Sequence, residues 1–176
     1  FKLMQGWRNH ARTEDARKFT RLLIGPWTHG TIGSSQATGD ISFGTNAEVD
    51  ILEEHLRWYD QRLKSTHTGI DEEPPIKLFV MGDNVWRYEN EWPLARTQYT
   101  NFYFHSDGTA NSLNGDGSLN RTPPKSEKPD EYTYNPERPV PTIGGQIMDG
   151  ARSGPRDRRP AERRDDVLVY TSNVLD

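Results

Sequence analysis

The sequence predicts an α/β segment followed by a β-rich segment, with the change near residue 70. Residues 1–70 combine helical spacing of apolar residues with a short apolar run, whereas residues 71–176 show short alternating patterns and most of the turn signals. Only 32% of the 176 residues are hydrophobic, but five Trp, seven Tyr and six Phe at a net charge of −4 argue against a disordered chain. We therefore expect two domains, residues 1–70 and residues 71–176, the second an antiparallel sandwich such as a jelly roll.

The first elements follow from apolar spacing and from chain breakers. Leu3, Trp7 and Ala11 recur at helical spacing and predict a short amphipathic helix. Residues 21–24 form an apolar run of the kind found in strands buried on both faces of a parallel sheet. Gly25 and Pro26 end this run because proline lacks an N–H and fixes φ. Residues 27–30 are therefore expected on a loop at the carboxyl end of the strand.

A longer helix is predicted over residues 45–64. Thr45 and Glu48 have the spacing of a capping box, and Gly69 marks a stop just beyond the helix. An apolar stripe at helical spacing comprises Val49, Leu52, Leu56, Tyr59 and Leu63. We expect this helix to pack one side on a sheet.

In the second segment the apolar period changes to two. Ile76, Leu78 and Val80 alternate with their neighbours and predict a strand, which ends at the turn signal of residues 82–84. Further strand candidates lie at residues 99–105, 132–134 and 167–170.

Composition excludes several classes of site and partner. The absence of cysteine excludes disulfides, thiolate metal sites and a cysteine nucleophile, and the five histidines lack the spacing of metal ligands, so no metal or cofactor is expected. Residues 152–166 hold six arginines but also four acidic residues, which predicts ion pairing between strands rather than nucleic-acid binding. No apolar run is long enough to span a bilayer. We expect a soluble protein, with a cytoplasmic location only slightly favoured over others.

His29 is the leading candidate for a catalytic residue. A histidine on a loop directly after a buried parallel strand lies where open α/β sheets place their ligands, and imidazole is suited to proton transfer at neutral pH. The alternative is a surface or loop-packing histidine, and position alone does not separate the two.

Several segments together resemble the CocE/NonD hydrolases, the family of cocaine esterase, glutaryl acylases, α-amino acid ester hydrolases and X-Pro dipeptidyl-peptidases. Residues 25–29 read Gly-Pro-Trp-Thr-His, which resembles the family's Gly-Pro-Trp-x-His signature. The other matching segments, in the same order as in the family, are Phe79-Val80-Met81-Gly82 with Trp86-Arg87, Glu91-Trp92-Pro93-Leu94, Pro141-Thr142-Ile143-Gly144-Gly145, and residues 154–168. The resemblance covers essentially the whole chain.

The resemblance implies the end of an α/β-hydrolase domain over residues 1–70 and the beginning of a jelly-roll domain over residues 71–176. It further implies a serine hydrolase that cleaves an ester or amide bond, or a short peptide, through an acyl-enzyme, without a cofactor. His29 matches the triad histidine, the general base and acid. Trp27, Ile147 and Met148 are the positions expected at the substrate pocket.

The same resemblance places the triad serine, the triad aspartate and the oxyanion hole outside these residues. The chain starts at Phe1 without Met and stops in an apolar stretch, so we expect a piece of a longer polypeptide. Loss of triad members typically costs on the order of 10⁴-fold to 10⁶-fold in rate, so we expect the piece alone to be inactive and to need the remainder of its polypeptide as a partner. We also expect an exposed apolar face on residues 1–70. Homo-oligomerisation is left open.

A second hypothesis treats the β-rich part as a non-catalytic jelly-roll module that binds carbohydrate or a protein partner. Such a module would not need the strand, histidine loop and helix of residues 19–64, and this difference separates the two hypotheses.

Overall fold

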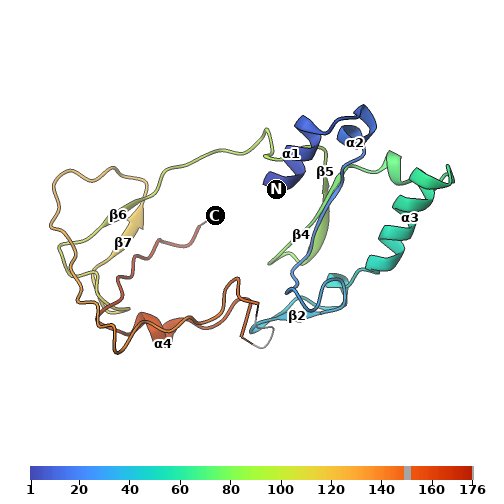
Figure 1. Ribbon diagram of the computed structural model, residues 1–176. Helices are drawn as coiled ribbons and strands as arrows, with labels where there is room; N and C mark the ends of the chain where they lie inside the picture. The colour runs from blue at the N-terminus through green and yellow to red at the C-terminus, as the bar shows by residue number, and fades with distance from the viewer. Residues whose placement is uncertain (149–151, 176) are drawn as a thin grey trace. The chain divides into compact units, whose positions relative to one another are not determined.

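The chain forms two compact units, which are described one at a time. The computed structural model describes residues 1–148 and 152–175 (Figure 1). The first unit comprises Phe1–Thr97 with Ile147–Gly154, and the second comprises Gln98–Gln146 with Pro155–Asp176. Within the described residues, no helix has the length and apolar character needed to cross a membrane.

A three-stranded mixed sheet lies at the centre of the first unit. Its strands are β1 (Leu22–Ile24), β4 (Ile76–Val80) and β5 (Val85–Glu89), in the order β1-β4-β5. Strand β4 pairs parallel to β1 and antiparallel to β5. Three of the five β4 side chains are buried, including Ile76 at 0% exposure, as expected for a strand with a neighbour on each side.

The predicted domain boundary at residue 70/71 falls before β4, whereas the compact units divide after Thr97. The alternation in residues 76–80 correctly predicts a strand, but an alternating pattern does not identify the strand's partners. Pairing with β1 and β5 places residues 71–97 in the same unit as residues 1–70. An α/β-hydrolase domain and a jelly roll with the predicted limits stay predictions.

Two short helices precede the sheet. Helix α1 (Lys2–His10) buries Met4, which packs with Ile76 and Leu78 in one core cluster. Helix α2 (Glu14–Lys18) begins at Thr13, whose hydroxyl accepts a hydrogen bond from the Ala16 amide at 3.2 Å. The predicted helix at the N-terminus is confirmed, but its predicted apolar stripe is not buried throughout, because Leu3 and Trp7 are 75% and 54% exposed.

Helix α3 (Ile51–Leu63) starts later than the capping-box pattern predicts. Thr45–Ala47 form the short 3₁₀ helix η1, Glu48 is extended, and the carboxylate of Asp50 caps α3 by accepting from the Glu53 amide at 2.9 Å. Asp50 and Glu53 therefore provide the capping interaction that was assigned to Thr45 and Glu48.

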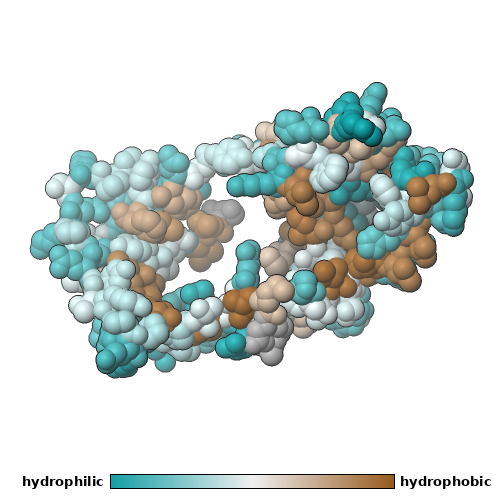
Figure 2. Space-filling view, viewed as in Figure 1, coloured by the Kyte–Doolittle hydropathy of each residue, from teal (hydrophilic) through white to brown (hydrophobic). Residues whose placement is uncertain are grey.

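The apolar stripe of α3 does not pack on the sheet. Its four helical members are all exposed: Leu52, Leu56, Tyr59 and Leu63, by 67%, 47%, 50% and 76%. A neighbouring face of the helix, with Ile51 and Trp58, lines a cavity together with the residues of β1. Figure 2 shows hydrophobic side chains gathered on the surface of the first unit. The expected exposed apolar face of residues 1–70 is thus confirmed.

Short elements connect β1 to α3. Strands β2 (Ala37–Thr38) and β3 (Ile41–Ser42) form a small antiparallel hairpin, and η1 follows it. A second core cluster consists of Phe43, Ala47 and Phe79, with Trp86 packed against it. The 3₁₀ helix η2 (Ile70–Glu72) then leads into β4.

The second unit is held together by a few strands and a carboxylate. Strands β6 (Tyr103–His105) and β7 (Ser118–Asn120) pair antiparallel, and the short helix α4 (Arg159–Glu162) lies farther along the chain. Asp130 accepts hydrogen bonds from Ser106, Ala110 and Tyr170.

Several predicted features of the second unit are wrong in detail. Residues 132–134 form no strand, and Tyr132 and Tyr134 are exposed, so their side chains supply no buried face for a sheet. Among residues 167–170, Leu168 alone forms a β-bridge, an isolated one to Asn111. The ion pairs Arg159–Asp157 and Arg164–Asp166 join residues two apart in the chain instead of neighbouring strands.

Candidate functional site

His29 lies on a tight turn just beyond the end of β1. Pro26 is buried and closes the strand, whereas His29 is exposed. Thr28 and Thr31 hold the turn on either side of His29. The Thr31 amide donates to the Thr28 carbonyl at 3.2 Å, the Thr28 amide donates to the Thr31 hydroxyl at 3.1 Å, and the two hydroxyls are 3.0 Å apart. The turn therefore fixes the backbone that carries the imidazole.

Trp27 anchors the same loop to the core of the first unit. Its indole N–H donates to the Ala47 carbonyl at 2.9 Å, and its ring lies 5.7 Å from that of Trp86. A Cβ at Gly25 would lie 2.5 Å from the Trp27 ring, so the backbone needs a glycine at that position. The spacing of glycine, proline and tryptophan in residues 25–27 thus has a packing reason.

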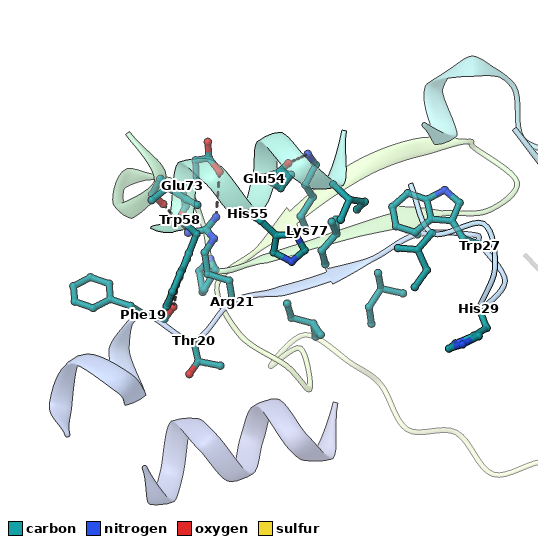
Figure 3. Close-up of a pocket in the computed structure, with 18 of the residues that line it drawn as sticks. Phe19, Thr20, Arg21, Trp27, His29, Glu54, His55, Trp58, Glu73 and Lys77 are labelled. Atoms are coloured by element: carbon teal, nitrogen blue, oxygen red, sulfur yellow. Dashed lines mark hydrogen bonds and ion pairs between the residues drawn. The ribbon is translucent and has the colours of Figure 1, made fainter. Parts of the chain in front are cut away.

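An open cavity of about 920 Å³ runs along β1 and the inner face of α3. Figure 3 shows Phe19 and Trp58 toward one end of the labelled residues, Trp27 and His29 at the other, and His55 between them. Within the part of the chain that the structure describes, β1 has a paired strand on one side only, and the cavity follows this strand. The imidazole of His29 has no hydrogen-bonding partner among residues 1–148 and 152–175.

The charged groups beside the cavity are paired with one another. The Lys77 ammonium forms an ion pair with the Glu54 carboxylate at 2.7 Å (N···O). The Glu73 carboxylate forms ion pairs with the guanidinium groups of Arg21 at 3.1 Å and Arg57 at 2.5 Å. Burial lowers the pKa of Arg21 against the opposing effect of Glu73. Burial is the largest single effect on the pKa of Lys77 and lowers it, but the hydrogen bond to Glu54, the charge of Glu54 and the neighbouring Tyr88 together outweigh burial and raise the pKa. These pairs neutralise the wall of the cavity next to α3.

The sequence-predicted pocket residues are only partly brought together. Trp27 lines the cavity with His29, whereas Ile147 and Met148 are not among the lining residues. Ile147 is half-buried and Met148 is 78% exposed, and both are assigned to the first unit. Their role at a substrate pocket stays a prediction.

Sequence reasoning did not identify the residues that α3 contributes. His55 and Trp58 line the cavity, although neither belongs to the apolar stripe of the helix. A histidine and a tryptophan three residues apart were the available signal, but nothing in a single sequence shows which face of the helix turns inward. Among the described residues, no group of three or more histidine or acidic side chains is arranged to hold a metal ion.

Comparison with known proteins gives a family for the chain. Residues 68–176 match the family described as the X-Pro dipeptidyl-peptidase C-terminal non-catalytic domain. Cocaine esterase from Rhodococcus sp. strain MB1 Bresler is 37% identical over 182 residues, which cover 97% of this chain and 31% of that protein.

Two mycobacterial proteins, each named as a candidate serine esterase, are similar over a shorter stretch. The proteins of Mycobacterium bovis and Mycobacterium tuberculosis are each 31% identical over 88 residues, half of this chain and 13% of either relative. The chain thus spans about a third of the length of cocaine esterase and less of the other two. With the family match over residues 68–176, these similarities show that the chain belongs to the CocE/NonD family of serine hydrolases and carries that family's X-Pro dipeptidyl-peptidase C-terminal domain.

Proposed function

We propose that residues 1–97 contribute the general base and acid, His29, to a serine hydrolase that cleaves an ester or amide bond of a small molecule or short peptide. In this reaction His29 accepts the proton of a serine hydroxyl as the serine attacks the carbonyl carbon. It then returns the proton to the leaving group, and an acyl-enzyme remains for hydrolysis. The serine and the aspartate of the triad come from residues outside these 176.

The observation that carries the proposal is the placement of His29. The imidazole stands exposed on a turn at the carboxyl end of β1, and Thr28 and Thr31, which flank the turn, are joined by hydrogen bonds. A proton-transfer group needs this combination of a rigid backbone and an accessible ring. The 37% identity to cocaine esterase supports the same class of chemistry.

The matched domain has a different part in the proposal. The family description of residues 68–176 is non-catalytic, and His29 lies before this range. We propose that residues 68–176 support the hydrolase and contribute a loop near its substrate, with Ile147 and Met148 as candidates. The alternative, a free-standing module that binds carbohydrate or a protein partner, is favoured only by that description, and it assigns no task to His29.

The test uses the longer polypeptide that supplies the serine, with p-nitrophenyl acetate as the substrate. We expect His29→Ala to lower kcat/KM by on the order of 10⁴-fold while the protein remains folded. His67→Ala is the matched control, because His67 is 79% exposed, lies after α3 and does not line the cavity. Full activity in His29→Ala would refute the assignment. Carbohydrate-array binding by the longer polypeptide that persists in an inactive His29→Ala variant would reveal a separate binding function.

A further inference from the structure

Thr38 lies next to the strand end that leads to His29. Thr38 closes β2, is only 8% exposed, and donates its hydroxyl proton to the carbonyl of Pro26. Pro26 is itself buried and stands three residues before His29. The hydroxyl of Thr38 therefore fixes the first peptide group of the loop that carries the imidazole.

The methyl group of Thr38 meets a second segment, remote in sequence. Gly154 has φ +87°, and a Cβ at this residue would lie 2.5 Å from the Thr38 Cγ2 and 2.9 Å from the Gly39 amide nitrogen. Only a glycine permits both the backbone conformation and this approach. Gly154 thus packs against the same threonine that fixes Pro26.

His29 depends on such backbone anchors. Its ring makes no hydrogen bond within the described part of the chain, so the position of the imidazole follows from the backbone of residues 26–31. Trp27 ties the middle of this loop to Ala47, and the paired hydroxyls of residues 28 and 31 close the turn. Thr38 holds the beginning of the loop, where it leaves β1.

We propose that Thr38 is a positioning residue for His29, with its hydroxyl fixing the Pro26 carbonyl and its methyl group supporting the backbone at Gly154. The inference rests on the proposed function of His29. Without the hydroxyl, the Pro26 carbonyl is left buried without this donor, and the loop shifts to find another. A displacement of about 1 Å in a proton-transfer group can cost on the order of 100-fold in rate.

The test separates the two halves of the side chain in the longer polypeptide. Thr38→Val keeps the shape but removes the donor, and Thr38→Ser keeps the donor but removes the methyl group. Thr68→Val is the matched control, because Thr68 makes the same kind of bond, from its hydroxyl to the Arg57 carbonyl at 3.1 Å, and does not line the cavity. The burst of p-nitrophenol counts competent active sites, so each kcat refers to folded enzyme.

We expect Thr38→Val to lower kcat per active site by about 10-fold to 100-fold with KM within about twofold, since the loss lies in proton transfer. Thr38→Ser should keep kcat within about threefold, and Thr68→Val should match the wild type. If Thr38→Val has the kcat of Thr68→Val while His29→Ala is inactive, the positioning role is overturned and the proposed function stands. If His29→Ala is fully active, both proposals fail.

Discussion

Asp130 organises the second unit, and replacing it by asparagine should destabilise that unit. Its Oδ2 accepts from the Ser106 hydroxyl at 2.6 Å and the Tyr170 hydroxyl at 2.5 Å, and its Oδ1 accepts from the Ala110 amide at 2.9 Å. Ala110 is completely buried, so its amide needs an internal acceptor. These three donors belong to segments that are up to 64 residues apart in the chain.

The expected loss of stability in Asp130→Asn follows from the change of the hydrogen-bond acceptor from a carboxylate to an amide. Asparagine offers a single carbonyl oxygen, which can serve the Ala110 amide while the two hydroxyls rotate to accept from the new NH₂ group. Three charge-assisted bonds then become neutral ones. A bond to a charged group contributes about 1.5–3 kcal/mol and a neutral bond about 1 kcal/mol, so with partial solvent exposure we expect a loss of about 2 kcal/mol.

Two measurements check this value. Urea unfolding followed by tyrosine fluorescence gives the free energy of unfolding, and native-state hydrogen exchange at the Ala110 amide reports the local opening. A loss of about 2 kcal/mol corresponds to roughly 30-fold faster exchange at that amide. Asp60→Asn is the control, because its ion pair with Lys64 is a surface pair four residues apart on α3 and should contribute under about 0.5 kcal/mol.

The same cluster predicts a pH dependence with a definite sign. Hydrogen bonds from Ser106, Tyr170 and the Ala110 amide lower the pKa of Asp130 below 3.8, so its contribution to stability is present above that pH and is lost as the pH falls through the lowered pKa. The bond to Asp130 raises the pKa of Tyr170 to about 12. The contribution of Tyr170 is therefore present below pH 10 and lost as the pH rises toward 12. An Asp130→Asn variant within about 0.5 kcal/mol of the wild type, together with a Tyr170 that titrates like the other tyrosines, would refute this reasoning.

Three further predictions concern the core, a shared carboxylate and a histidine. Ile76→Ala should lower the free energy of unfolding by about 2–5 kcal/mol because Ile76 is fully buried. All five tryptophans precede residue 98, so tryptophan fluorescence during urea unfolding reports the stability of the first unit. A change under about 0.5 kcal/mol would contradict this prediction. Glu73→Gln removes the carboxylate shared by two half-buried arginines and should lower the free energy of unfolding by about 1–3 kcal/mol, measured by the same assay. A variant as stable as the wild type would show that the two ion pairs contribute nothing. The hydrogen bond to Glu127 raises the pKa of His105, so its contribution is present below pH 6.5 and lost as the pH rises through the raised pKa. An NMR titration should show a lower His105 pKa in Glu127→Gln, and an unchanged value would count against the pair.

The elements that local pattern determines could be predicted from the sequence. The run of residues 21–24, ended by glycine and proline, contains β1, although the three side chains of this strand are half-buried and not fully buried as expected, and His29 lies on the expected loop. The alternation of residues 76–80 is confirmed as β4. These signals are strong because proline and buried strands impose steric and solvation demands on their own residues.

The misses arise where a pattern allows more than one partner. Thr45 and Asp50 can both cap a helix, and the bond from the Val49 amide to the Gly33 carbonyl at 2.8 Å keeps the chain extended until Asp50. The stripe on α3 shows that the helix is amphipathic but not which face meets β1. The sequence also did not indicate that the compact units divide after Thr97, because the parallel pairing of β1 with β4 spans about 50 residues and leaves no local trace, whereas the family match begins at residue 68, near the predicted boundary.

The contact of Gly154 with Thr38 has a consequence for the order in which the chain folds during synthesis. Unit one is not contiguous: residues 98–146 of the second unit emerge from the ribosome before the segment of residues 147–154 that completes the first. The sheet and α3 can form as soon as residue 97 is available, but the loop before His29 gains its last support only after residue 154 has been added. Residues 98–146 form a long connection between the two parts of the first unit, but closing a long loop costs little more entropy than closing a shorter one. The contact of Gly154 with Thr38 is therefore delayed mainly by the time that translation of these residues takes. A ribosome stalled just after residue 146 would thus carry a folded sheet in which Thr38, next to the histidine loop, still lacks its contact with Gly154.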